Sequence, residues 1–303
     1  MKSFKELIEL AKKRGKKRCV VVAAADRPVL EGVKMALELN LIKPVLIGDR
    51  EAILKTAEQT GIDLKETEIK DIKDPQKALE ESIREVKEKG DFLMKGMISS
   101  SLFLKGVLNK EWGLRTGNIL SHIAVLEIPG YHKLVFMSDG GMNPKLNLEL
   151  RISIIKNAVK VLKSLGINRP GVALVAASET VHPDMPETTD AVKIVEMNKA
   201  GQIEGCIIEG PFGFDVAISK EAAHHKKIDS IIAGDIDFIL MPNISSGNIW
   251  AKGLIFFAGA KAAGMVAGAA RPVIMLSRTD KPETKLNSIA LGVAIAEDTK
   301  DPG

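Results

Sequence analysis

The sequence predicts an α/β fold, because short apolar runs typical of buried strands alternate with segments of helical periodicity along its 303 residues. Continuous apolar runs suit strands that are covered on both faces, as in parallel sheets. We therefore expect largely parallel sheets. The predicted strands are Arg18–Ala25, Pro44–Ile47, Phe92–Met94, His122–Glu127, Leu134–Met137, Val172–Ala177, Cys206–Glu209, Phe238–Met241 and Pro272–Leu276.

The composition is that of a protein with a large core. Hydrophobic residues make up 45% and charged residues 27%, which is enough for one or two domains at this length. The formal net charge of +4 is small and aromatic residues are only 4%. Neither a basic footprint nor a stacking platform for bases is present, so we expect no nucleic-acid partner.

The stretch 253–276 is rich in glycine, alanine and large apolar residues, but Lys261 and Arg271 divide it into a helix and a strand. We therefore expect no transmembrane helix and no membrane partner. Cys19 and Cys206 each lie in apolar surroundings, and two thiols provide no disulfide framework. These features favour a reducing, cytoplasmic location.

A break in the middle of the chain suggests two domains. Gly140-Gly141-Met142-Asn143-Pro144 interrupts regular structure just before a long predicted helix at about 146–165. Neither G-x-G-x-x-G after a strand nor G-x-x-x-x-G-K-[ST] occurs, so these routes to NAD or ATP are unsupported. The glycines from 259 to 268 have spacings typical of a helix that another backbone approaches closely.

The most informative segment joins a strand, a polar turn and a helix. Pro272–Leu276 predicts a buried strand, and helical spacing of apolar residues begins shortly after it. The helix is expected from about residue 281. Asp280 and Glu283 have the spacing of a capping box, although Thr279 is an equal candidate for the cap.

Ser277 and Arg278 fall in the turn before this helix. A helix N-terminus at the end of a parallel strand offers unpaired backbone N–H groups, and here it also carries a hydroxyl and a guanidinium. Such a site suits an anion or a developing negative charge. The alternative is a turn whose serine, threonine and aspartate only cap the helix, and the residue types alone do not decide between the two.

Two other loops have polar groups after a predicted strand. Lys95–Ser101 brings Ser99, Ser100 and, on the next helical turn, Lys105 together, which suits a phosphate. The alternative is that the serines are caps and Lys105 is solvated.

Asn243, Gly247 and Asn248 follow the strand 238–241 and lead into a helix expected near Asn248, capped by Ser245 or Ser246. Ligands of α/β proteins gather at such carboxyl ends. This loop could also serve only to cap the helix. The histidines show no spacing typical of a metal site, so no metal is expected.

The run LSRTDKPETKLNSIALGVAIA at 276–296 resembles the C-terminal signature of the phosphate acetyl/butyryltransferase family, and most closely its butyryl type. Other segments agree in the same order, so the resemblance covers essentially the whole chain. They are VVAAADRPVLEGV at 21–33, DFLMKGMISSSLFLKGVLNKEWGLRTGNILSH at 91–122, VALVAASETVHPDMPETTDA at 172–191, EGPFGFDVAIS at 209–219 and LMPNISSGNIWAKGL at 240–254.

The resemblance implies two three-layer α/β/α domains of the isocitrate-dehydrogenase-like type, with the active site in the cleft between them. Residues 1–145 with about 266–303 would form domain I, and about 146–265 would form domain II. It also implies a homodimer or a larger homo-oligomer.

The implied reaction is acyl-CoA + phosphate = acyl phosphate + CoA, by direct transfer without a covalent enzyme intermediate. Coenzyme A thioester and phosphate would be substrates, with no tightly bound cofactor. Ser277 would hydrogen-bond developing charge and Arg278 would neutralise it. Acetyl-type members carry an aspartate as thiol base where this chain has Thr284, so Glu283 or Asp280 would replace it.

Phosphate and coenzyme A would bind at Ser99, Ser100, Asn243, Gly247 and Asn248. Two cations compete for the phosphate: Lys105, where acetyl-type members have an arginine, and Arg115 in the following loop.

Three alternatives to a butyryl-CoA-dependent enzyme remain. The first is acetyl-CoA as substrate. The second is a metal-dependent decarboxylating dehydrogenase, but Tyr131 is the only tyrosine and the aspartates do not cluster. The third is a non-catalytic protein that binds acyl-CoA.

Overall fold

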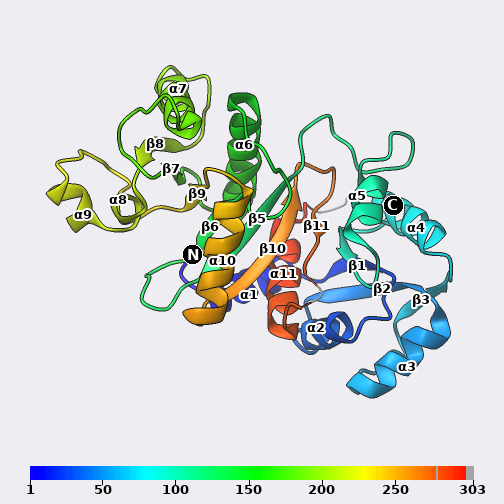
Figure 1. The fold of residues 1–303 in the computed structure, drawn as a ribbon. Coiled ribbons are helices and arrows are strands. Elements are labelled where there is room, and N and C mark those ends of the chain that lie inside the picture. The colour runs from blue at the N-terminus through cyan, green and yellow to red at the C-terminus, as the bar shows by residue number, and fades with distance from the viewer. Residues whose placement is uncertain (278, 298–303) are drawn as a thin grey trace. The chain divides into compact units, whose positions relative to one another are not determined.

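The computed structural model describes residues 1–277 and 279–297 (Figure 1). The chain divides into two compact units. The terminal unit contains residues 3–118 and the chain from 262 onward, and the central unit contains residues 1–2 and 119–261. Arg278, one of the predicted site residues, lies outside the described residues.

The terminal unit is built on strands in the order β3-β2-β1-β4-β11-β10. The pairs β3–β2, β2–β1, β1–β4 and β4–β11 are parallel, and the pair β11–β10 is antiparallel. The strands are β1 Lys17–Val22, β2 Ile42–Gly48, β3 Glu68–Asp71, β4 Phe92–Lys95, β10 Lys261–Ala267 and β11 Val273–Ile274. The helices are α1 Phe4–Lys13, α2 Arg27–Glu38, α3 Arg50–Thr60, α4 Pro75–Glu88, α5 Ser100–Val107 and α11 Pro282–Ile295.

Helix α11 is the central helix of this unit's core. It packs against α1, α2 and β11, and every residue from Lys285 to Ile295 is buried. In Figure 1 this helix, in red, lies beside the blue helices of the chain's beginning. The last part of the sequence therefore completes a unit that the first part starts.

The central unit has the strand order β5-β6-β9-β7-β8, in which only the β5–β6 pair is antiparallel. Its strands are β5 Ser121–Glu127, β6 Val135–Ser138, β7 Gly171–Val175, β8 Ile207–Phe212 and β9 Phe238–Leu240. Its helices are α6 Leu148–Ser164, α7 Pro186–Lys199, α8 Phe214–Ile218, α9 Lys220–His225 and α10 Ile244–Phe257.

The predicted fold class, α/β with largely parallel strands, is confirmed. The helical interpretation of the glycines between 259 and 268 was wrong, because Lys261–Ala267 forms the antiparallel strand β10. The compact units change over at 118/119 and 261/262. The expected domain limits at 145 and 265 stay a prediction. Within the described residues, no helix is both long enough and apolar enough to cross a membrane.

Candidate active site

Three loops of the terminal unit lie at one edge of its sheet, which we call the carboxyl edge. They follow β1, β4 and β11, and their described residues are 23–26, 96–99, 275–277 and 279–281. Parallel register aligns the strand ends, since Val22 pairs with Lys95 and Met94 with Ile274. Ligands bind in α/β proteins at this edge. The structure therefore brings two predicted site loops, those of Ser99 and Ser277, to the same edge.

The loop after β4 lies directly on the loop after β1. The N–H of Gly96 donates to the carbonyl oxygen of Val22 at 2.9 Å, and that of Met97 donates to Ala23 at 2.7 Å. A Cβ on Gly96 would overlap the carbonyl oxygen of Ala23. Only glycine allows this approach, so the path of the chain toward Ser99 is fixed by backbone packing.

The peptide groups around Ser277 are held from two sides. Its N–H donates to Oδ2 of Asp280 at 2.8 Å, and its carbonyl oxygen accepts from Nζ of Lys285 at 3.1 Å. The Ser277 Oγ lies 3.0 Å from Oγ1 of Thr279. Ser277 itself is exposed. Ser277 is thus an exposed serine whose backbone is restrained by the charged side chains of Asp280 and Lys285.

Lys285 is a buried cation at this edge, with only 3% of its surface exposed. Burial lowers the pKa of its ammonium, while the carboxylates of Asp280 and Asp26 act in the opposite direction. Lysine is almost never fully buried unless it is paired. Sequence reasoning missed this residue. A signal was present, because Lys285 lies four residues before Ile289 and so shares the apolar side of the predicted helix.

The predicted capping box at the start of α11 was wrong. The N-cap residue is Lys281, which makes no side-chain capping bond, and Asp280 turns back to Ser277 instead. Glu283 lies in the first turn of α11 and is exposed. Its position near the turn allows the predicted role as thiol base, and that role stays a prediction.

Ser99 caps α5 through a hydrogen bond from the N–H of Leu102 at 3.2 Å. Ser100 is the first residue of that helix, and Lys105 lies in its last turn, exposed. One lone pair of the Ser99 hydroxyl is thus in use, as the capping alternative required.

Arg115 lies in the exposed loop that follows α5. Both neighbouring residues are anchored. The N–H of Leu114 donates to Val107 at 2.8 Å, and Oγ1 of Thr116 donates to the carbonyl oxygen of Gly268 at 2.7 Å. The base of the Arg115 side chain is therefore fixed while its guanidinium stays in solvent.

The candidates Asn243, Gly247 and Asn248 belong to the central unit. Asn243 caps α10 in a capping box with Ser246. The helix begins at Ile244, so the expected start near Asn248 was four residues late, and the expected serine cap was wrong. Gly247 and Asn248 are consequently helical residues.

A loop after β6 packs against the first turn of α10. Nδ2 of Asn248 donates to the carbonyl oxygen of Gly140 at 2.9 Å, and a Cβ on Gly140 would lie 3.2 Å from the carbonyl carbon of Gly247. Asn248 thus has a structural partner. The sequence marked this loop only as a break between domains.

Asp139, which is fully buried, organises the same loop. It accepts hydrogen bonds from the N–H groups of Gly141 and Met142, both at 2.8 Å, and from Nδ2 of Asn143 at 2.6 Å. An aspartate just before a glycine pair is a turn signal that could have been recognised from the sequence. Among the described residues, no group of three or more histidine, cysteine, aspartate or glutamate side chains is placed to hold a metal ion.

Comparison with known proteins identifies the family. The model described as "Phosphate acetyl/butaryl transferase" matches residues 3–90 and 86–293. The chain belongs to the phosphate acetyl/butyryltransferase family. As a member of this family it is an enzyme, a phosphate acyltransferase.

Relatives within the family include both acyl types. The phosphate butyryltransferase of Clostridium beijerinckii is 42% identical over 300 residues, covering 99% of each chain. The phosphate acetyltransferase of Thermotoga maritima is 39% identical over 294 residues, covering 97% of this chain and 99% of the relative. The crystal structure of a branched-chain phosphotransacylase from Enterococcus faecalis superposes with a TM-score of 0.82 at 27% identity, covering 92% of this chain and 99% of the other.

Proposed function

We propose that this phosphate acyltransferase prefers butyryl-CoA and catalyses butyryl-CoA + phosphate = butyryl phosphate + CoA. The observation that carries the proposal is the 42% identity to a protein named phosphate butyryltransferase over 99% of both chains. Acetyl-CoA is the second candidate, favoured by the 39% identity to a phosphate acetyltransferase. Neighbouring chain lengths differ by only about 1–3 kcal/mol per methylene in a hydrophobic pocket, so the preference must be measured.

We propose direct transfer, in which an anionic phosphate oxygen attacks the thioester carbonyl and the coenzyme A thiolate leaves. The exposed hydroxyl of Ser277 would donate a hydrogen bond to the developing oxyanion or thiolate. Arg278 would neutralise charge beside it. Glu283 would exchange the proton of the coenzyme A thiol, with Asp280 as the other candidate base.

The two candidate bases differ in exposure, since Asp280 is half-buried and Glu283 is exposed. Oδ2 of Asp280 accepts the N–H of Ser277, which supports a structural role for that carboxylate. Glu283 is exposed on the first turn of α11, where solvent can receive the proton. This difference favours Glu283.

Phosphate and coenzyme A would bind at Ser99, Ser100 and Asn243 through side-chain oxygens and helix N–H groups, and at Gly247 and Asn248. Lys105 or Arg115 would supply the cation. The fixed backbone on both sides of Arg115 supports that residue as the phosphate ligand, since a side chain whose base is already fixed loses less entropy on binding.

We further propose that no cofactor or metal is tightly bound, that the enzyme is cytoplasmic, and that it works as a homodimer or larger homo-oligomer. Two buried free thiols, Cys19 and Cys206, suit a reducing compartment. Helix α10 supports self-association, because Ile249, Phe256 and Phe257 are 71%, 73% and 96% exposed.

The test of the reaction is phosphate-dependent release of coenzyme A from acetyl-, butyryl- and isobutyryl-CoA, followed with a thiol reagent. Turnover that requires phosphate and has its highest kcat/KM with butyryl-CoA supports the proposal. A higher kcat/KM with acetyl-CoA would make the enzyme an acetyltransferase. Binding without phosphate-dependent release would leave only a binding function.

A further inference from the structure

The side chains of Asp280 and Lys285 both make hydrogen bonds to the backbone of Ser277. Asp280, whose position in the sequence suits a helix cap, bonds the N–H of Ser277 at 2.8 Å, and α11 starts without a side-chain cap. The carbonyl oxygen of Ser277 accepts from the buried ammonium of Lys285 at 3.1 Å. The N–H of Ser277 is therefore held by a carboxylate, and its carbonyl oxygen is held by an ammonium together with the N–H of Asp280, which donates at 3.2 Å.

Lys285 is itself locked in place by the packing of two helices. Helices α2 and α11 pack against each other, and a Cβ on Gly32 would lie 2.7 Å from Cβ of Lys285 and 3.4 Å from the carbonyl oxygen of Pro282. The glycine therefore lets α2 press directly on the base of the lysine side chain. A side chain fixed at its Cβ and 97% buried has few rotamers left, so its ammonium stays at the turn.

The start of α2 adds a counter-charge. Asp26 is 5% exposed and caps α2 by accepting the N–H of Val29 at 3.3 Å. Its carboxylate, like that of Asp280, favours the charged form of Lys285. A charged donor makes a hydrogen bond about twice as strong as a neutral one. The protein thus retains a buried cation whose hydrogen bond goes to the backbone of the residue that carries the exposed hydroxyl.

We propose that Lys285 is the positioning residue of acyl transfer, which holds the Ser277 peptide so that Oγ of Ser277 keeps the direction needed at the developing charge. The inference rests on the proposed function, because it gives Ser277 its role. Lys285 does not touch the substrate in this scheme. It acts through Ser277, and an error of about 1 Å in placing a group at the reaction centre can cost about a hundredfold in rate.

The decisive experiment is a double-mutant cycle. Lys285→Met, which keeps the length of the side chain but removes the donor, is made in the wild-type enzyme and in Ser277→Ala. Phosphate-dependent release of coenzyme A gives kcat and KM, and thermal unfolding checks the fold. Lys34→Met is the matched control, because Nζ of Lys34 also donates to a backbone carbonyl, that of Thr60 at 3.3 Å, away from the carboxyl edge.

We expect Lys285→Met to lower kcat about a hundredfold in the wild-type background with little change in KM. In Ser277→Ala it should cost nothing further, because the group that it positions is gone. Lys34→Met should keep wild-type kcat. An equal loss of kcat in both backgrounds would overturn the inference, since it would show that Lys285 acts independently of Ser277.

A second pair of variants keeps the inference testable if Lys285→Met does not fold. Asp280→Asn retains a carbonyl oxygen for the N–H of Ser277, whereas Asp280→Ala does not. Positioning of the Ser277 peptide predicts a clearly smaller loss of kcat for the asparagine variant than for the alanine variant. Equal losses would assign Asp280 as the base and contradict the positioning of Ser277 by this turn.

Different results would refute the proposed function and the inference about Lys285. A wild-type enzyme without phosphate-dependent release refutes the proposed function. An active wild-type enzyme whose Lys285→Met variant is folded and equally active refutes the inference alone.

Discussion

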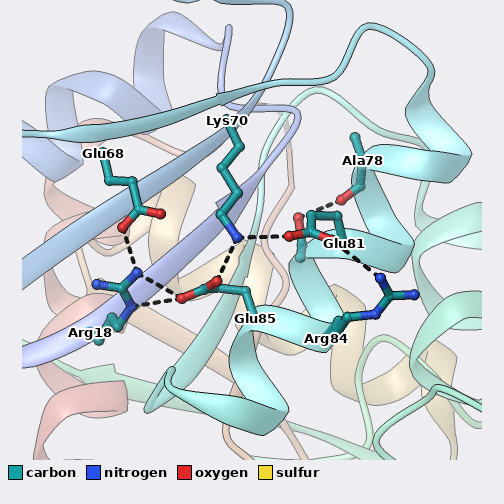
Figure 2. A network of polar contacts seen from close by, with 8 residues as sticks. Arg18, Glu68, Lys70, Ala78, Glu81, Arg84 and Glu85 are labelled. Carbon is teal, nitrogen blue, oxygen red and sulfur yellow. Dashed lines mark hydrogen bonds and ion pairs between the residues drawn. The ribbon is translucent and has the colours of Figure 1, made fainter.

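The two edges of the sheet in the terminal unit use charge in opposite ways. At the amino edge, Arg18 of β1, Glu68 and Lys70 of β3 and Glu85 of α4 form a network in which each charge meets an opposite charge within 2.6–2.9 Å, and Glu81 extends it through Lys70 (Figure 2). At the carboxyl edge, the ammonium of Lys285 donates to a backbone carbonyl, and the Ser277 hydroxyl is exposed.

The difference separates stability from function. A charge that is already paired with an opposite charge attracts a ligand only weakly. Removing one partner of a buried ion pair strongly destabilises the fold. A cation that orients a loop leaves the exposed groups of that loop free for chemistry. Changes at the amino edge should therefore alter unfolding and not turnover, and changes at the carboxyl edge should do the reverse.

The largest expected effect is on stability, from Glu85→Gln. The Glu85 side chain is 4% exposed and pairs with both Arg18 and Lys70, so loss of its charge leaves two cations without their buried partner. We expect a loss of about 3–5 kcal/mol in the free energy of unfolding, measured in urea, with unchanged kcat/KM.

Glu81→Gln is the control for this prediction. Glu81 also pairs with Lys70 but is 27% exposed, so its change should cost about 1 kcal/mol or less. Equal losses of unfolding free energy for the two variants would mean that burial of the carboxylate does not determine how much an ion pair of this network contributes to stability.

The next effect is on turnover, from Ser277→Ala. If its hydroxyl stabilises developing charge, kcat should fall by about 10²–10³. The unfolding free energy should stay within about 0.5 kcal/mol, because the side chain is exposed. Ser153→Ala is the control and should change neither quantity, because this half-buried serine of α6 only donates to the carbonyl oxygen of Glu149 in its own helix. If Ser277→Ala lost stability but kept a normal kcat, the carboxyl edge would contribute to stability and not to turnover, contrary to the comparison.

A smaller effect is expected at Asn243, which caps α10 and is also a candidate ligand. Asn243→Ala should cost about 1 kcal/mol of stability through loss of the cap. Asn243→Asp retains the cap and adds a negative charge. A raised KM for acyl-CoA or phosphate in the folded aspartate variant would support anion binding there, and an unchanged KM would leave Asn243 with its structural role alone.

The smallest effect at ordinary assay pH concerns the pH dependence of stability. Burial raises the pKa of Glu85, but hydrogen bonds and charges from Lys70 and Arg18 outweigh it and lower the pKa below the ordinary 4.5. The folded state therefore holds this proton less tightly than the unfolded state. The stabilisation is complete above about pH 4.5 and is lost as the pH falls through the lower folded pKa.

Urea unfolding of the wild-type enzyme and Glu85→Gln from pH 7 to pH 3 measures this contribution. The difference in stability between the two should stay constant near neutral pH and shrink in acid. A difference that grows in acid would contradict the direction of the pKa shift.

The fold was predictable where hydrophobic patterns were strong. The runs at 92–94 and 238–241 became β4 and β9, because continuous apolar residues have few alternatives to a buried strand. β10 was misassigned because its alanines and glycine suit a packed helix as well as a strand, and pairing with β11 decides the matter. β3 was missed because Glu68–Asp71 is polar and lies at the edge of the sheet.

The candidate site was predictable as a set of loops but not in its hydrogen bonds. Ser277 followed a recognisable strand and preceded a recognisable helix, so its place at the carboxyl edge came from pattern alone. The partner of Asp280 could not be foreseen, since a cap and a turn bond use the same side chain at the same spacing. The burial of Lys285 depends on α2, whose distance in sequence hides the contact.

The position of β11 between β4 and β10 has a consequence for the newly made polypeptide. Strands β1 to β4 are synthesised long before β11 and α11, which fill an interior place in the sheet and cover its core. A nascent chain that has passed residue 118 must keep that apolar surface protected while the whole central unit is translated. Ser277 therefore acquires its surroundings only after α11 has been translated.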